Sequence, residues 1–466
     1  MKWIWLIFLL IASIYSARSE ADEQVIEFRS FGQVTLYSAT PNPSHIMILI
    51  SGDGGWNKGA INIAQNLATL DSLVVGVNIK HYLTAQAANS EKCTYPAGDL
   101  EALSKFVQKK LNFPEYITPL LVGYSSGATL VYATLVEAPP GTFLGGVSLG
   151  FCPDLRLRKP LCKGYGLEWT YQSKISTYIF SPAPDIKSKF VVFQGVTDQV
   201  CDPKDTEDFV KKIPSANIVV LPKVGHGYAG FKNWLPQFMD TYAEFMKATP
   251  DKHSEQKTPA QELKDLPIVE VRSKTANNPL FALVVSGDGG WANIDRQLGE
   301  NLAAGGMDVV GLNSLQYFWK KRTPEDAGKD LDRILNHYFN AWGKKEVILI
   351  GYSLGADVLP FMATRLSAET LAKVKLVAML GPSNLVDFEF HLTDWLGGFS
   401  HNSSMPVLPE AEKLKDKKIL CVYAGDDKTS ICRKMGANTR AIPMGEGHHF
   451  DGNYSAIAES ILKAVQ

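Results

Sequence analysis

Short apolar runs alternate with longer amphipathic stretches along most of this chain. The runs are rich in valine, isoleucine and leucine, and several lead directly into glycine-containing segments. Glycine endings and β-branched residues favour buried strands over buried helices. Strands that alternate with helices form βαβ units and a parallel sheet. The predicted strands are residues 45–50, 73–77, 117–122 and 191–193, followed by 280–285, 308–312, 346–350 and 419–423.

The same pattern occurs twice. Ser-Gly-Asp-Gly-Gly-Trp follows the first of these strands in each half, at Ser51–Trp56 and at Ser286–Trp291. About 70 residues later each half contains Gly-Tyr-Ser-X-Gly, at Gly123–Gly127 and Gly351–Gly355. A repeat of this length indicates two units of one fold. A polar, proline-containing stretch between them is typical of a linker. The predicted organisation is residues 20–248, a linker at 249–263, and residues 264–466.

A Gly-X-Ser-X-Gly run after a strand is typical of the nucleophile elbow of an α/β-hydrolase, in which a tight turn lifts the serine hydroxyl above the sheet. We therefore predict two tandem α/β-hydrolase domains, each a mostly parallel sheet flanked by helices, with Ser125 and Ser353 as nucleophiles. The helix predicted after each serine points its free N–H groups toward the serine oxygen and any developing oxyanion. The alternative for each serine is an inert strand-to-helix turn.

A serine nucleophile needs a histidine base and an acid that orients this base. In this fold the chain order is serine, acid, histidine. The first half offers Asp198, which lies 73 residues after Ser125, and His226, which lies 28 residues further on. The acid follows a predicted strand, on a loop from which a carboxylate can reach an imidazole.

The second half repeats this order. Asp427 lies 74 residues after Ser353, and His448 follows 21 residues later. Asp426 is an adjacent rival for the acid, and His449 is an adjacent rival for the base. A Gly-His step in both halves favours His448, whereas the choice of acid stays open.

The Ser-Gly-Asp-Gly-Gly-Trp loop lies where this fold supplies the second N–H group of its oxyanion hole. Asp53 and Asp288 either hold the shape of this loop or contact substrate, and its tryptophans either pack or bind. The predicted donors are Gly54, Gly55 and Trp56 with Ser126 in the first half, and Gly289, Gly290 and Trp291 with Leu354 in the second.

The chain's composition excludes some classes of function. Its net charge is −1, so no nucleic-acid partner is expected, and no basic stretch argues for one. An apolar fraction of 45% is sufficient for full hydrophobic cores. No Cys/His spacing resembles a zinc site, and serine ester chemistry requires neither a metal nor an organic cofactor.

The first 19 residues have the pattern of a secretory signal, with Lys2, an apolar run at 3–15, and small residues at the cleavage spacing. A retained membrane anchor is the alternative.

Each half contains an even number of the six cysteines, which suits disulfides in an oxidising compartment. The first four cysteines allow three pairings. Cys421–Cys432 is the intradomain option in the second half, and free thiols are the alternative for all six.

The segments between serine and acid differ most between the halves, and in this fold they commonly form a lid. The first carries a basic cluster at 154–159 with Lys163, whereas the second is acidic and aromatic at 387–395. An acidic lid suits a cationic acyl group and a basic one suits phosphate. Ordinary solvated surface charge is the alternative for both.

Several motifs together resemble the bacterial virulence proteins of the VirJ and AcvB type. They are the paired Ser-Gly-Asp-Gly-Gly-Trp loops, Gly-Tyr-Ser353-Leu-Gly-Ala-Asp-Val-Leu-Pro, Glu389-Phe-His-Leu-Thr-Asp-Trp-Leu and Gly447-His-His-Phe-Asp-Gly. The second half resembles the single-domain VirJ form, and the whole chain resembles the two-domain AcvB form. The resemblance maps the family's serine onto Ser353, its histidine onto His448 and its acid onto Asp427.

This resemblance implies a periplasmic hydrolase of Gram-negative bacteria that releases lysine from lysyl-phosphatidylglycerol, and for VirJ-type members a link to type IV secretion. The two ammonium groups of a lysyl moiety would suit the carboxylates of Asp387, Glu389 or Asp394. The aromatic run at 317–319, followed by basic residues at 320–322, either contacts the membrane surface or packs in the core. The rival functions are a non-catalytic envelope or secretion partner and a soluble esterase or peptidase acting on small substrates.

Overall fold

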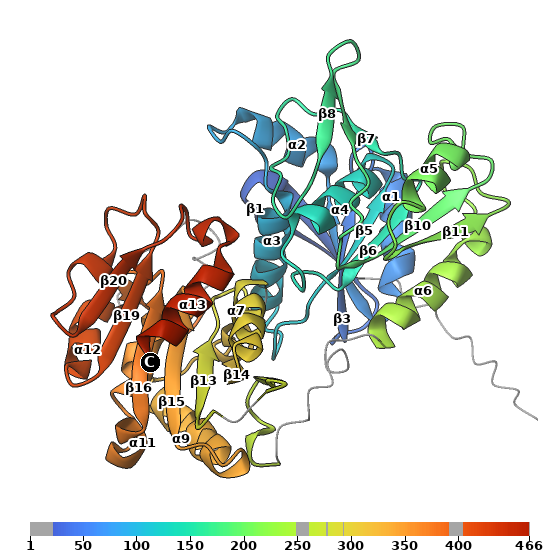
Figure 1. The fold of residues 1–466 in the computed structure, drawn as a ribbon. Coiled ribbons are helices and arrows are strands. Elements are labelled where there is room, and N and C mark those ends of the chain that lie inside the picture. The colour runs from blue at the N-terminus through green and yellow to red at the C-terminus, as the bar shows by residue number, and fades with distance from the viewer. Residues whose placement is uncertain (1–21, 248–260, 276–277, 292, 391–403, 466) are drawn as a thin grey trace, which may run out of the picture.

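The computed structural model describes residues 22–247, 261–275, 278–291, 293–390 and 404–465. They include two large sheets, one in each half of the chain, and each of these lies between two layers of helices (Figure 1). The predicted signal at 1–19, most of the predicted linker and Asp394 lie outside the described residues.

In the first half (22–247), β2 pairs antiparallel with both of its neighbours, the edge strand β1 and β4, and the other strands pair in parallel. Alternate strand residues face opposite layers, so Met47 and Leu49 belong to one core and Ile46 and Ile48 to the other. The order is β1 (Asp22–Phe28), β2 (Gly32–Ser38), β4 (Ser72–Val77), β3 (His45–Ile50), β5 (Leu120–Tyr124), β6 (Gly145–Leu149), β10 (Lys189–Gly195) and β11 (Ala216–Leu221).

Helices α1 (Lys58–Ala68) and α6 (Leu235–Lys247) cover one face of this sheet. The other face is covered by α2 (Ile79–Ala88), α3 (Pro96–Lys110), α4 (Ser126–Glu137) and α5 (Pro203–Val210).

The second half (261–465) repeats this plan, with one antiparallel edge strand, β12. The strand order is β12 (Ile268–Val271), β14 (Asp308–Leu312), β13 (Leu280–Val285), β15 (Glu346–Tyr352), β16 (Val374–Leu380), β19 (Lys418–Tyr423) and β20 (Thr439–Pro443). One face carries α7 (Asn293–Ala304) and α13 (Tyr454–Ala464). The other carries α8 (Ser314–Tyr317), α9 (Pro324–Ala341), α10 (Leu354–Ala363), α11 (Ala368–Ala372) and α12 (Val407–Ala411).

The predicted α/β-hydrolase fold is confirmed, with a difference at one strand. The strand predicted at 117–122 begins at Leu120. Ile117 instead donates its N–H to Gln108 Oε1 at 2.7 Å and accepts from Gln108 Nε2 at 2.8 Å. A side chain of α3 thus satisfies the backbone groups that a sheet would otherwise pair.

Between serine and acid, the first half inserts a small sheet of β7 (Asp154–Leu155), β9 (Thr177–Phe180) and β8 (Trp169–Gln172). The second half has a short antiparallel pair there, β17 (Leu385–Val386) and β18 (Met405–Pro406).

The cysteines pair as Cys93–Cys162, Cys152–Cys201 and Cys421–Cys432, which confirms disulfides and selects one of the three pairings in the first half.

Helix α3 of the first half packs against the second half (Figure 1). Lys109 Nζ donates to the carbonyl of Trp319 at 2.6 Å, and Trp319 Nε1 donates to the carbonyl of Phe113 at 2.8 Å. Tyr317, Phe318 and Trp319 are at most 2% exposed. The membrane-surface role considered for this aromatic run is therefore wrong, and the run packs in the core between the halves. None of the described helices combines the length and apolar character needed to cross a bilayer.

Candidate active sites

Both predicted nucleophiles stand at sharp strand-to-helix turns. Ser125 lies between β5 and α4 with φ 55° and ψ −124°, and Ser353 lies between β15 and α10 with φ 53° and ψ −121°. A positive φ is strained for a residue with a side chain and is kept where the surroundings enforce it. The two elbows therefore share one backbone geometry, which presents each serine at the first turn of a helix whose leading N–H groups have no partner within that helix.

Close backbone approach explains the glycines of the pentapeptide. A Cβ on Gly123 would lie 2.2 Å from the carbonyl oxygen of Gly127, and a Cβ on Gly127 would lie 2.2 Å from that of Ile50. The second elbow repeats both approaches at 2.3 and 2.0 Å. No side chain fits at these distances, so the sequence pattern is a packing requirement of the turn.

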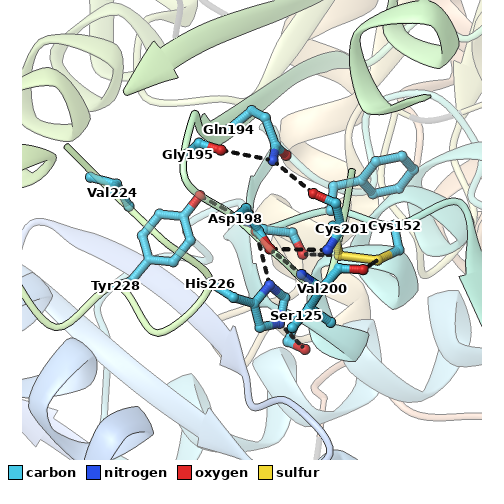
Figure 2. Close-up of polar contacts among 12 residues, drawn as sticks. Ser125, Cys152, Gln194, Gly195, Asp198, Val200, Cys201, Val224, His226 and Tyr228 are labelled. Atoms are coloured by element: carbon cyan, nitrogen blue, oxygen red, sulfur yellow. Dashed lines mark hydrogen bonds and ion pairs between the residues drawn. A yellow bond between two sulfur atoms is a disulfide. The ribbon is translucent and has the colours of Figure 1, made fainter. Parts of the chain in front are cut away.

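The first half contains a complete hydrogen-bonded triad (Figure 2). His226 Nε2 lies 2.9 Å from Ser125 Oγ, and His226 Nδ1 lies 2.9 Å from Asp198 Oδ2. The Asp198 side chain is fully buried, and its other oxygen accepts from the N–H groups of Val200 at 2.9 Å and Cys201 at 3.0 Å. Figure 2 shows the imidazole between the serine and the carboxylate, as the spacing predicted.

The second half contains a serine–histidine pair. His448 Nε2 lies 2.8 Å from Ser353 Oγ. Among the described residues no carboxylate hydrogen-bonds His448. Asp427 Oδ1 accepts instead from the N–H and the hydroxyl of Thr429, at 2.8 and 2.9 Å. Asp426 Oδ1 accepts from the N–H of Gly447 at 3.0 Å. The prediction that Asp427 hydrogen-bonds His448 as the acid of a triad is therefore wrong.

Asp427 nevertheless occupies the place of Asp198. The N–H of Asp198 bonds the carbonyl of Gly195, three residues back, and the N–H of Asp427 bonds the carbonyl of Ala424 in the same way. Each carboxylate then accepts from the N–H two residues ahead. Of the two rival acids, Asp427 is therefore the positional counterpart of the triad aspartate.

A disulfide marks the difference between the two acid loops. Cys152 and Cys201 are bonded beside Asp198, three residues after β6 ends and three residues after the acid (Figure 2). The corresponding positions in the second half are serines, Ser383 and Ser430. A cavity of about 390 Å³ lies there, with His448 on its wall and further lining from Ser383, Asn384, Asp426, Asp427 and Ser430.

The glycine-rich loop is a closed turn in both halves. The N–H of Gly55 donates to the carbonyl of Gly52 at 2.9 Å, and that of Gly290 donates to Gly287 at 3.0 Å. Both glycines have positive φ, 70° and 76°. Gly55 and Gly290, predicted as oxyanion donors, thus use their N–H groups within the turn. The predicted donors left to these loops are the N–H groups of Gly54, Trp56, Gly289 and Trp291, with Ser126 and Leu354 at the helix starts.

Both loop tryptophans pack across glycines of the neighbouring strand. A Cβ on Gly76 would lie 2.1 Å from the Trp56 ring, and one on Gly311 would lie 2.2 Å from the Trp291 ring. Asp53 accepts a short hydrogen bond from the Ser126 hydroxyl, which ties its loop to the elbow. Of the alternatives left open by the sequence, the structure favours packing for the rings and loop shaping for Asp53.

Two carboxylates of the acidic insertion, which were predicted to bind the substrate, are engaged by other side chains of the protein. Asp387 accepts from the Ser404 hydroxyl at 2.7 Å, and Glu389 lies 3.4 Å from Lys109 at the boundary between the halves. Asp357, which was not among the predicted site residues, lies one turn after Ser353 and is 5% exposed. Burial raises the pKa of Asp357 to about 8, although Ser383 N–H donates to it at 2.6 Å.

Asp198, Cys201 and His226 bring potential metal-ligand atoms within 4.8 Å of one another. The Cys201 sulfur is bonded to Cys152, and the other two residues bond each other. The triad and the disulfide account for this cluster.

Comparison with known proteins identifies the family. The profile described as bacterial virulence protein (VirJ) matches residues 44–142 and 279–466, more than half of the chain. The chain belongs to the VirJ family. The matched residues include Ser125 and the whole Ser353–His448 pair, whereas Asp198 and His226 lie between the matched segments. A search of the curated proteins found no match.

Solved structures similar to this VirJ-family chain each cover about half of it. A putative dienelactone hydrolase from Klebsiella pneumoniae subsp. pneumoniae MGH 78578 is 14% identical, with a TM-score of 0.35, over 49% of this chain and 98% of its own. A serine hydrolase without lid from Xanthomonas campestris is 18% identical, with a TM-score of 0.32, over 49% and 95%. An esterase domain from Rhodothermus marinus is 13% identical, with a TM-score of 0.33, over 48% and 98%.

Proposed function

We propose that this VirJ-family protein is a serine hydrolase with two nucleophiles, Ser125 and Ser353, that cleaves carboxylic esters. The observation that carries the proposal is the hydrogen bond from each serine to a histidine, 2.9 Å in the first half and 2.8 Å in the second, at a strained elbow. A histidine within this distance can take the hydroxyl proton as the serine attacks.

The mechanism is acyl transfer. The serine oxygen attacks the ester carbonyl while the histidine accepts its proton, and N–H groups at the helix start and the glycine-rich loop stabilise the oxyanion. The protonated histidine then delivers the proton to the leaving alcohol. Water, deprotonated by the same histidine, hydrolyses the acyl-enzyme and restores the serine.

For the Ser353 site we propose an aminoacyl ester substrate, specifically lysyl-phosphatidylglycerol. The cavity beside His448 carries the carboxylates of Asp426 and Asp427, and Asp288 is exposed on the neighbouring loop. Carboxylates around a pocket favour a cationic acyl group. These residues replace the insertion carboxylates as the candidate site for the lysyl ammonium groups.

We propose that the protein acts in the periplasm, at the surface of the membrane that holds this lipid. All six cysteines are paired, which supports an oxidising compartment. The rival is a non-catalytic partner of a secretion or envelope assembly. It draws support from the second site, where no carboxylate of the described residues bonds His448 as Asp198 bonds His226 in the first site.

Hydrolysis of lysyl-phosphatidylglycerol in vesicles, measured separately for Ser125→Ala and Ser353→Ala, tests the proposal. We expect Ser353→Ala to abolish lysine release while the protein folds normally, and Ser125→Ala to retain it. Full lysine release by Ser353→Ala would refute the assignment. Turnover of small esters without lysine release would instead support a soluble esterase.

A further inference from the structure

A lysine of the first half reaches the glycine-rich loop of the second half. Lys105, on α3, is 4% exposed. Its Nζ lies 2.9 Å from Glu101 Oε1 and donates to the carbonyl oxygen of Asp288 at 3.2 Å. Asp288 belongs to the loop that follows β13, so this contact crosses from one sheet system to the other.

This loop borders the second nucleophile directly. A Cβ on Gly287 would lie 3.4 Å from Ser353 Cβ and 3.0 Å from the Tyr352 ring. Glu101 Oε1 would lie 4.0 Å from a Cβ on Gly289. The ion pair of α3, in which Lys105 is buried and Glu101 is partly exposed, therefore lies against the part of the loop from which an oxyanion donor is expected.

The two halves hold this loop by different means. In the first half Ser126, the residue after the nucleophile, donates its hydroxyl to Asp53 and ties the loop to the elbow. The corresponding residue in the second half is Leu354, which has no hydroxyl. The contact from Lys105 to the carbonyl of Asp288 anchors the second loop from outside its own half.

The chemistry of the contact favours a functional role. Burial alone would lower the pKa of Lys105, but the carboxylates of Glu101 and Asp288 outweigh it and hold the pKa above its ordinary value, so the ammonium stays charged. A charged donor on the carbonyl of Asp288 polarises the peptide unit that also contains the Gly289 N–H. That N–H becomes a stronger donor, and the loop is held in place.

We propose that Lys105 is a positioning residue which the first half supplies to the Ser353 site, where it fixes and polarises the Asp288–Gly289 peptide for oxyanion stabilisation. The inference rests on the proposed esterase activity at Ser353. It implies that the second half is an incomplete hydrolase without α3 of the first half.

The test measures kcat and KM for a p-nitrophenyl ester and for lysyl-phosphatidylglycerol vesicles in a Ser125→Ala background, where Ser353 is the nucleophile. We expect Lys105→Met to lower kcat by about tenfold to a hundredfold with KM changed by less than about twofold, since a weakened oxyanion donor acts on the transition state. Lys105→Arg, which keeps the charge, is expected to restore most of kcat.

Lys109→Met is the matched control, because Lys109 lies one turn further along α3 and bonds Trp319 across the same boundary. Its kcat is expected to match the background. If Lys105→Met folds poorly, Glu101→Gln/Lys105→Met removes the carboxylate left unpaired and should show the same loss. An unchanged kcat in the folded Lys105 variant, or an equal loss in Lys109→Met, overturns the inference. An inactive Ser125→Ala background overturns the proposed function at Ser353, and the inference with it.

Discussion

The two halves share one elbow geometry but orient their histidines differently. In the first half His226 bonds Ser125 on one side and the buried Asp198 on the other. In the second half His448 bonds Ser353, while the positional counterpart of the acid, Asp427, bonds Thr429. A repeated nucleophile motif therefore does not imply a repeated triad.

The difference lies in the loop that carries the acid. A disulfide to Cys152 holds Cys201, whose N–H donates to Asp198 and keeps this carboxylate facing the imidazole. Ser383 and Ser430 leave the second loop without such a link. A cavity with two carboxylates on its wall lies there instead. The first site holds its histidine between the serine and a buried carboxylate, whereas the second has a cavity beside its histidine, where we propose that the cationic acyl group binds.

The largest predicted difference between the sites concerns their acids. In a Ser353→Ala background, Asp198→Asn is expected to lower kcat of the Ser125 site by about 10³–10⁴-fold, because the imidazole loses the partner that sets its tautomer. In a Ser125→Ala background, Asp427→Asn is expected to lower kcat for a neutral ester by less than about tenfold. Steady-state kinetics of both variants checks this. Equal losses would show that Asp427 completes a triad during turnover.

Removal of the disulfide beside Asp198 should weaken the first site alone. Cys152→Ser/Cys201→Ser opens a link between residues 49 apart, which corresponds to about 4 kcal/mol of unfolding free energy in the chain-entropy view. We expect lower stability in chemical denaturation and a lower kcat at Ser125, with kcat at Ser353 unchanged. Cys93→Ser/Cys162→Ser serves as the control, since it also removes a link in the first half. An equal loss of Ser125 activity in this control would contradict a specific role for the disulfide beside the acid.

The buried acid after the second nucleophile predicts a pH effect on stability. The raised pKa of Asp357, about 8, means that the folded state keeps a proton which the unfolded state releases above its ordinary pKa. Stability from this group is therefore present at low pH and is lost as pH rises toward 8, on the order of 3 kcal/mol between pH 5 and pH 8. Asp357→Asn should flatten the pH dependence of thermal unfolding by that amount. An unchanged slope in this variant would contradict the assignment.

The smallest predicted effect concerns selectivity for charge. Asp426→Asn/Asp427→Asn should raise KM at the Ser353 site by about tenfold for a lysyl ester, roughly 1.4 kcal/mol, and leave KM for a neutral ester unchanged. Lys428→Gln, on the same loop, is the control for altered surface charge. A parallel rise for both esters would show that the cavity does not select the ammonium group.

The fold, both serines and both histidines could be predicted from the sequence because they depend on local patterns. Glycines at the elbows are required by backbone approaches of about 2 Å, which leave a motif in the sequence. Chain order then pointed to Asp198 and His226, and the structure brings them together.

Features that depend on packing between distant segments were not predictable. The aromatic run ending at Trp319 resembles an interfacial patch, but α3 covers it. The position of Asp427 was identified, whereas its hydrogen bond to Thr429 depends on how the loop closes. The contact of Lys105 with Asp288 joins residues 183 apart and left no pattern in either segment.

We infer above all that both elbows present activated serine nucleophiles. Reaction of the full chain with a fluorophosphonate, followed by peptide mass spectrometry, tests it most directly. We expect covalent adducts on Ser125 and on Ser353, each abolished by substitution of its own histidine, His226→Ala or His448→Ala. A folded protein that carries no adduct on either serine would contradict it.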